Sequence, residues 1–342
     1  MRLLLCSLST IYGVITKIRN LLFDYKIIKS ETYNIPIICI GNLSIGGSGK
    51  TPHTNYIAQL LTPKYKIAIL SRGYRRKSSG FKYVKVNSDP SSVGDEPLQL
   101  KQNNEDCIVA VNKNRNNGIK RILNEHPETN IILLDDGFQH RKIKAGLNIL
   151  ITPFDKPFTA DSLLPLGTLR ESYDNSKRAD IIIISKTPEE TSLKEKRKII
   201  TDLNLQSHQR EYFSSIYYHN YKCLEKNIEV TNKEEYSITL ITGIANPNPL
   251  VKYLRKKGGK VNLIQFSDHH DYKLKDIKNI LSVFNQDKSV KKLILTTEKD
   301  ATKLRGFLKA FKGINVYYIP IDVIINDKEI FKQQLLNYVT RD

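Results

Sequence analysis

The chain has 342 residues, of which 40% are apolar, so it is long enough for two domains and general disorder is excluded. Its four cysteines lie far apart without a Cys-x-x-Cys spacing; neither a zinc knuckle nor a disulfide framework is indicated, and a reducing cytoplasm is the simpler interpretation. The formal net charge of +19 indicates an anionic partner, either nucleic acid or an acidic membrane surface. The basic clusters are scattered and form no recognisable nucleic-acid module, so we expect no nucleic-acid partner.

The N-terminal segment carries no charge from residue 3 to residue 16, and its apolar residues recur at spacings of three and four, which predicts one helical stripe from Leu4 to Leu22. An uncharged helix of this length measures about 21 Å, which is shorter than the hydrocarbon core of about 30 Å. We therefore predict that residues 1–30 form a membrane-associated amphipathic helix that lies in or dips into the membrane surface, with Lys17 and Arg19 at the headgroups. A helix packed on the protein's own core is the alternative; a cleaved signal peptide is disfavoured because no small-x-small cleavage site follows.

A glycine-rich segment, GNLSIGGSGKTP, occupies residues 41–52, between an apolar run at 35–40 that predicts a buried strand and a helical pattern at 53–61. Strand, glycine-rich turn, Lys-Thr and helix is the layout of a phosphate-binding loop, because glycines let backbone N–H groups converge on phosphate oxygens at a helix N-terminus. Lys50 would reach the β- and γ-phosphates of ATP, and Thr51 would place its hydroxyl on Mg²⁺. Ser44 stands where this pattern usually has its first glycine. The expected nucleotide-binding residues are Gly46, Gly47, Ser48, Gly49, Lys50 and Thr51.

A second apolar run, residues 131–134, delivers Asp135 and Asp136 at the C-terminal end of a predicted strand, where open α/β sheets bind ligands. One of these two carboxylates is expected to hold Mg²⁺ together with Thr51, directly or through water. The sequence leaves open which of the two contacts the metal.

Further strands are predicted at 65–70, 107–111, 147–152 and 179–185, alternating with helical segments. This pattern predicts an α/β fold in which residues 31–211 form a P-loop NTPase-like domain with a doubly wound, mainly parallel sheet. Residues 212–224 are predicted to be an extended strand linker. A second series, with strands at 237–242, 261–266, 292–296 and 316–319, predicts a smaller α/β domain over residues 225–342.

Several polar motifs follow the phosphate loop in a fixed order, either just after predicted strands or in loops. They are VGDEP at 93–97, LDDGFQH at 134–140, LLPLGTLRE at 163–171, DHH at 268–270 and TEKD at 297–300. With these motifs the chain closely resembles, over nearly its whole length, the tetraacyldisaccharide 4'-kinases, the membrane-associated kinases of lipid A synthesis. The resemblance implies ATP-dependent phosphorylation of the 4'-hydroxyl of a lipid-linked glucosamine disaccharide 1-phosphate, giving lipid IVA, at the cytoplasmic face of the inner membrane.

The resemblance also implies catalytic residues. It places the catalytic carboxylate at Asp95, which we expect in an irregular segment outside the sheet, and it makes His269 the partner that orients this base or receives its proton, with His270 less favoured. These residues come from different predicted domains, so domain closure would assemble the pair. The alternative is that Asp268 caps a helix and that both histidines are solvated.

Two arginines are candidates for phosphate contacts, because guanidinium groups match phosphate oxygens in bidentate fashion. They are Arg115, near the start of a predicted helix, and Arg170 in the LLPLGTLRE motif; each could contact ATP or the 1-phosphate of the acceptor.

Other nucleotide-dependent proteins fit less well. The partitioning ATPases carry a lysine where Ile45 stands, and a GTPase would need an Asn-Lys-x-Asp guanine reader, which this chain lacks at residues 185–187. The remaining alternative is a P-loop ATPase switch, or a basic nucleic-acid-associated NTPase, without a lipid acceptor. Dependence of ATP turnover on an amphiphilic sugar acceptor would distinguish the kinase from these.

Overall fold

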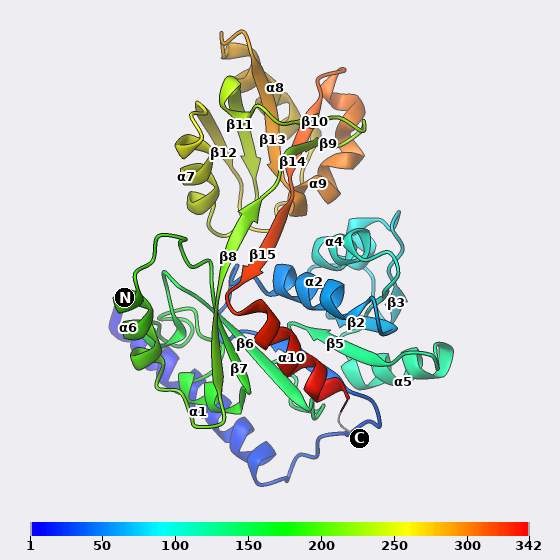
Figure 1. Ribbon diagram of the computed structural model, residues 1–342, viewed down its shortest axis with the longest axis vertical. Coiled ribbons are helices and arrows are strands. Elements are labelled where there is room, and N and C mark those ends of the chain that lie inside the picture. Colours follow the sequence, from blue (N-terminus) through cyan, green and yellow to red (C-terminus); the bar gives the residue numbers. More distant parts are fainter. Residues whose placement is uncertain (1, 341–342) are drawn as a thin grey trace.

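The computed structural model describes residues 2–340, which form two sheets stacked along the long axis of the molecule (Figure 1). The larger sheet has nine strands among the described residues, in the order β15-β8-β7-β6-β1-β5-β2-β4-β3. All neighbours are parallel except the two edge pairs, β3 with β4 and β15 with β8. The strands are β1 (Ile37–Gly41), β2 (Ile67–Ser71), β3 (Lys82–Tyr83), β4 (Ile108–Val111), β5 (Ile131–Asp135), β6 (Leu147–Pro153), β7 (Ile181–Ser185), β8 (Arg210–Tyr218) and β15 (Ile321–Ile325).

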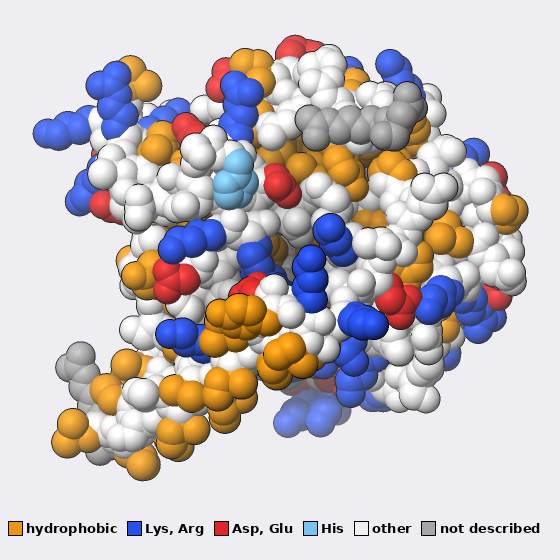
Figure 2. Space-filling view, turned by 90° about the horizontal axis from the view of Figure 1, so that it is seen from below, with side chains coloured by type: hydrophobic (Ala, Val, Ile, Leu, Met, Phe, Trp, Pro, Cys, Tyr) orange, Lys and Arg blue, Asp and Glu red, His pale blue; other side chains and the backbone are white. Residues whose placement is uncertain are grey.

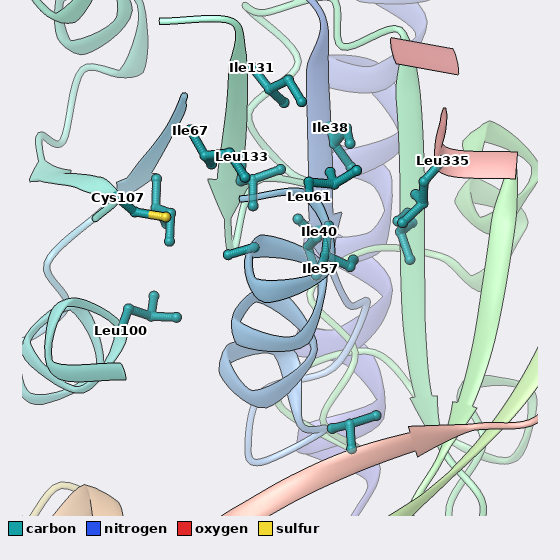
Figure 3. Packing of buried hydrophobic residues seen from close by; sticks show 14 of the residues in the cluster. Ile38, Ile40, Ile57, Leu61, Ile67, Leu100, Cys107, Ile131, Leu133 and Leu335 are labelled. Carbon is teal, nitrogen blue, oxygen red and sulfur yellow. The ribbon is translucent and has the colours of Figure 1, made fainter. Parts of the chain in front are cut away.

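Helices cover both faces of this sheet, because alternate residues of its fully buried strands face opposite sides. On one face, Ile38 and Ile40 of β1 pack with Ile57 and Leu61 of α2 (Lys50–Leu61) and with Leu335 of α10 (Lys328–Val339), as Figure 3 shows. Helix α4 (Asp95–Asn103), which follows the short α3 (Pro90–Val93), packs on the same face. The opposite face is covered by α5 (Arg115–Glu125) and α6 (Leu193–Leu203). The predicted doubly wound fold is confirmed.

The smaller sheet has the order β10-β9-β14-β13-β11-β12, and the four strands from β14 to β12 are parallel. Helices α8 (Leu274–Gln286) and α9 (Glu298–Leu304) pack on one face, and α7 (Asn248–Lys256) packs on the other. The strands are β9 (Tyr221–Cys223), β10 (Glu229–Val230), β11 (Ser237–Thr242), β12 (Val261–Gln265), β13 (Lys292–Thr297) and β14 (Val316–Ile319).

Two long strands connect the sheets. β8 pairs with β7 at residues 210–213 and with β15 at residues 214–218, and these two strands run side by side between the two parts in Figure 1. The chain therefore returns to the larger sheet after β14: Val323 of β15 and Phe331 of α10 are buried in the core of that sheet. Residues 321–340 thus lie with the larger part, whereas the sequence-based range 225–342 assigned them to the smaller domain.

Helix α1 (Arg2–Asp24) lies against the larger part but leaves one side open. Ser9 and Tyr12 donate hydrogen bonds to the carbonyl oxygens of Leu163 and Arg170, so one face of the helix is held by the protein. Figure 2 shows hydrophobic side chains gathered on its projecting part. Within residues 2–340, no helix is both long enough and apolar enough to cross a membrane. The exposed apolar residues of α1 are Leu3, Leu4, Leu8, Ile11, Val14, Ile15, Ile18 and Leu21.

Candidate active site

The phosphate loop begins where β1 ends at Gly41 and closes where α2 begins at Lys50. Gly46 and Gly49 have φ angles of 104° and 92°, in the left-handed region that side chains disfavour, so the turn requires glycine at these positions. The loop therefore leads directly into a helix N-terminus, where free N–H groups and the helix dipole favour an anion.

Lys50 lies in a network of charges at the mouth of this loop. Its Nζ donates to Oδ1 of Asn42 at 3.2 Å and lies 3.5 Å from Oδ1 of Asp136. Arg170 Nη1 lies 3.0 Å from both carboxylate oxygens of Asp136. Burial raises the pKa of Asp136, but Lys50 and Arg170 outweigh burial and lower it to about 2. Asp136 is therefore a carboxylate held between two cations, at the place where a metal ion and phosphates would bring further charges.

Asp135 occupies a different environment, one residue before Asp136. It is paired in register with Ile40 of β1, which places it at the base of the phosphate loop. Its two oxygens accept hydrogen bonds from the hydroxyls of Thr54 and Ser71, each at 3.1 Å. Burial raises its pKa to about 6, and the neighbouring carboxylates of Glu96 and Asp136 add to the shift.

Arg115 does not reach the phosphate loop. Its guanidinium is buried and donates to the carbonyl oxygens of Asn112 and Asp135, at 2.6 and 3.4 Å. Burial lowers its pKa to about 10. These contacts make Arg115 a support beneath the end of β5, and of the two arginines selected from the sequence only Arg170 lines the cavity described below.

The structure brings Asp95 and His269 together across the two parts. His269 Nδ1 lies 3.0 and 3.2 Å from the two oxygens of Asp95, and Lys303 Nζ lies 2.9 Å from Oδ2 of the same carboxylate. Asp95 is the first residue of α4, where we had expected an irregular segment. The helix begins there because Asp95 and Glu96 place negative charge in its first turn and because Pro97 is tolerated in a first turn.

The other nitrogen of His269 faces Lys299, whose Nζ lies 3.1 Å from Nε2. An ammonium group only donates, so Nε2 accepts and the ring proton is assigned to Nδ1, facing Asp95. Burial raises the pKa of Asp95, but the hydrogen bond from His269 and the charges of Lys299 and Lys303 outweigh burial and hold it well below the usual range. Lys299 also lies 3.2 Å from Glu96. The motifs alone did not indicate a role for these two lysines, although their four-residue spacing puts them on one face of α9.

His270 points away from this cluster. Its Nε2 lies 2.9 Å from Oδ2 of Asp276, and its ring stacks on Phe266 at a centroid distance of 4.5 Å. Asp268 is not a helix cap, since α8 begins after Lys273; its carboxylate receives a hydrogen bond from Lys299. The alternative in which Asp268 caps a helix and both histidines are solvated is therefore ruled out.

These groups surround one cavity of about 920 Å³ between the carboxyl ends of the two sheets. Asp136, Arg170 and His269 line it, together with the phosphate loop and Tyr12 and Arg19 of α1. Asp95, Asp135 and Arg115 lie behind the lining residues.

The donor set near the phosphate loop suits Mg²⁺. Among residues 2–340 there is no group of three or more His, Cys, Asp and Glu side chains that could hold a metal by itself. Mg²⁺ does not need such a cage, because it is commonly held by one or two carboxylates and by the phosphates of the substrate. The hydroxyl of Thr51 at the helix start and the cavity-lining carboxylate of Asp136 fit this pattern.

A phosphate loop on a doubly wound sheet, facing a buried Asp–His pair across one cavity, defines a P-loop phosphotransferase. Residues 1–340 match the family model of the tetraacyldisaccharide-1-P 4'-kinases. Tetraacyldisaccharide 4'-kinases of Bacteroides fragilis and Flavobacterium johnsoniae are 41% and 39% identical to the chain; the alignments cover 97% and 99% of it, and 91% and 97% of those relatives. The crystal structure of the "apo" form of LpxK from Aquifex aeolicus in complex with ATP is similar at a TM-score of 0.77 and 29% identity, over 99% of both chains.

The chain belongs to the tetraacyldisaccharide 4'-kinase family, as its motifs indicated. It is an ATP-dependent lipid A precursor 4'-kinase, and a nucleotide switch without a lipid acceptor is not favoured.

Proposed function

We propose that the larger part of the molecule binds MgATP and that the Asp95–His269 pair, made from both parts, takes the proton of the acceptor's 4'-hydroxyl. The observation that carries this proposal is the contact between Asp95 and His269, beside the same cavity as Lys50 and Asp136. It supports a site in which donor and acceptor meet between the two sheets.

On the phosphate side, N–H groups of the loop, among them those of Gly49 and Lys50, bind the β- and γ-phosphates, and Lys50 and Arg170 stabilise the charge of the transferred phosphoryl group. Mg²⁺, held by Thr51 and Asp136, would neutralise phosphate charge. Asp135 keeps its place behind Asp136 by binding the hydroxyls of Thr54 and Ser71. Of the two aspartates, Asp136 suits a direct metal contact because it lines the cavity and is ionised.

On the proton side, His269 lies between Asp95 and the cavity. The lowered pKa of Asp95 makes this carboxylate alone a weak base, although it was the base that we expected from the sequence. We assign the roles to the pair as a unit: a hydroxyl that replaces the Lys299 ammonium at Nε2 gives its proton to the imidazole as the new O–P bond forms. The bond between the γ-phosphorus and the β,γ-bridging oxygen breaks in the same step, and ADP leaves. Asp95 holds the Nδ1 proton and stabilises the resulting imidazolium.

The membrane surface supplies the acceptor. Tyr12 and Arg19 of α1 line the cavity, while Leu4, Leu8 and Ile11 of the same helix are exposed. A helix that rests on the inner membrane at its cytoplasmic face would therefore place the cavity at the headgroups, where an acylated disaccharide 1-phosphate lies.

The chemistry is tested with γ-labelled ATP, Mg²⁺ and tetraacyldisaccharide 1-phosphate. The wild-type protein should yield a bisphosphorylated lipid, while nucleic acid in place of the lipid should give no added turnover. Label released as free phosphate, regardless of the lipid, would contradict the proposal.

The membrane role is tested by substitution rather than by deletion of residues 1–24, because Tyr12 and Asn20 of α1 bind Arg170 and Glu171. The combined variant Leu4→Ser, Leu8→Ser, Ile11→Ser should no longer sediment with vesicles that contain anionic lipid, yet it should phosphorylate a detergent-dispersed acceptor at the wild-type rate. If the variant still sediments in high salt, the anchor lies elsewhere.

A further inference from the structure

Side chains from outside the phosphate loop hold three of its carbonyl oxygens in succession. Lys186 Nζ donates to the carbonyl of Gly47, Ser185 Oγ donates to that of Ser48 at 2.7 Å, and His53 Nδ1 lies 2.7 Å from that of Gly49. None of these contacts is part of the motif that identifies a phosphate loop, whose known groups are its N–H donors, Lys50 and Thr51.

The carbonyl contacts matter because each peptide unit is planar and trans. Its C=O and the following N–H point in opposite directions, so a group that fixes the carbonyl also fixes the direction of the N–H. The contact at Ser48 thus orients the N–H of Gly49, and the contact at Gly49 orients the N–H of Lys50. The Gly49 carbonyl also accepts from the backbone N–H of His53 at 3.1 Å, so the imidazole adds a second, shorter contact to the first hydrogen bond of the helix. The N–H of Ser48 is less affected, because it donates to the carbonyl of Gly46.

His53 connects the loop to a second element of the protein. Its side chain is buried, and its Nε2 lies 2.8 Å from the hydroxyl of Ser214 on β8. A carbonyl only accepts, so Nδ1 carries the ring proton and Nε2 accepts from Ser214. Burial lowers the pKa of His53 to about 4, which keeps the ring neutral at the pH of the cell.

Ser214 lies where β8 changes its pairing partner. Residues up to 213 pair with β7, and from Ser214 onward the strand pairs with β15 and leads to the smaller sheet. The chain Gly49–His53–Ser214 therefore connects the start of the phosphate-binding helix to the point where the connector leaves the larger sheet.

We propose that His53 is a positioning residue that holds the Gly49–Lys50 peptide with its N–H directed at the β- and γ-phosphates, braced from behind by Ser214. The proposal deepens the proposed function, since it rests on the phosphate role of the loop. It assigns to His53 a role that is exerted through the loop peptide, although the buried ring also borders the cavity.

Two isosteric variants separate the contacts of the ring. The amide nitrogen of His53→Asn takes the place of Nδ1 and keeps a donor for Gly49, whereas that of His53→Gln takes the place of Nε2 and does not. We expect the dissociation constant of ATP to rise by about threefold in His53→Asn, which loses only the contact with Ser214, and by about tenfold in His53→Gln, which loses the hydrogen bond to Gly49. AMP, which has no β- or γ-phosphate, should bind all three proteins equally.

Titration calorimetry with ATP and AMP supplies these constants, and thermal unfolding shows that each variant is folded. Equal ATP affinities for the Asn and Gln variants, or equal losses for ATP and AMP, would overturn the proposal. Ser214→Ala should weaken ATP binding by about threefold, and its effect should vanish in a His53→Gln background. A wild-type protein that bound ATP no better than AMP would instead refute the proposed role of the loop itself.

Discussion

The two sheets share one topology at the cavity but supply different chemistry. Both are parallel at their centre, and their carboxyl ends face each other (Figure 1). The larger sheet presents a glycine-rich loop, whose ligands are backbone N–H groups on a rigid scaffold. The smaller sheet presents charged side chains, His269, Lys299 and Lys303. In the proposed function, nucleotide binding therefore belongs to one part, whereas proton transfer requires both.

The contacts that join the parts are concentrated between α4 and α9. Asp95 meets His269 and Lys303, and Glu96 meets Lys299. Further along the same helix, Gln99 Nε2 donates to Oε2 of Glu298 at 2.6 Å. The proposed catalytic pair, Asp95 and His269, is therefore built into the interface that holds the parts together.

The largest effect is expected from the removal of Lys50, which lies in the larger part and tests whether that part alone binds the nucleotide. Lys50→Ala should reduce turnover by about 10³-fold or more, because a preorganised cation at the transferred phosphoryl group is lost. Rates are measured with labelled ATP at saturating acceptor. Lys144→Ala, which removes an exposed lysine, is the control; near-normal activity of Lys50→Ala would end the phosphate-loop assignment.

The next test concerns the pair that spans the parts. Asp95→Ala and His269→Ala should each lower kcat by about 10²- to 10⁴-fold, the range of general base catalysis, and the double variant should be little worse than either. ATP affinity should change little, because the donor site is in the larger part. His270→Ala is a matched control and should retain activity. Additive losses, or losses confined to ATP binding, would contradict a shared role.

The fold could be predicted largely from apolar runs, since fully buried parallel strands read as continuous apolar segments. The pairing of β15 with β8 could not be predicted in this way. Only Pro320 separates β15 from β14, and its partner β8 lies about a hundred residues earlier in the chain. Such a pairing depends on tertiary contacts that no local pattern encodes.

The candidate site shows the same limit. Lys50, Thr51 and the two aspartates follow from strand ends and loop chemistry. The spacing of Lys299 and Lys303 indicates a shared helix face but not its partner, and His53 lies inside a helix with no distinctive spacing. Arg115 looked like a phosphate ligand because it opens a helix after a strand. Its two terminal nitrogens donate to main-chain carbonyls instead, while its buried Nε has no hydrogen-bond partner.

A third test measures how the stability of the larger part depends on pH in the acid range. The pKa of His53 is lowered from 6.5 to about 4, so the native state binds its proton less readily than the unfolded chain does. The neutral ring therefore stabilises the fold above pH 6.5, and this contribution is lost as pH falls toward 4. The free energy of unfolding of the wild type, relative to His53→Asn, should fall by about 3 kcal/mol between pH 7 and pH 4.

Urea unfolding at several pH values measures this difference, and His208→Asn, at an exposed histidine, should show none. A wild type and a His53→Asn variant that lose stability in parallel would mean that the buried ring is not kept neutral.

The smallest expected effect lies at the interface between the parts. Burial raises the pKa of Glu298, and the hydrogen bonds from Gln99 and Asn103 partly offset this. Gln99→Ala removes the shorter hydrogen bond and leaves that of Asn103 at 3.3 Å, which should cost about 1 kcal/mol, or about fivefold in kcat/KM for the acceptor. ATP affinity should be unchanged.

The loss in kcat/KM should shrink as pH falls, because a protonated Glu298 no longer needs these donors. Gln102→Ala, on the same helix but bonded to the carbonyl of Val86, is the matched control. An equal loss in both variants, or a loss independent of pH, would mean that the contact between Gln99 and Glu298 does not set how the two parts meet.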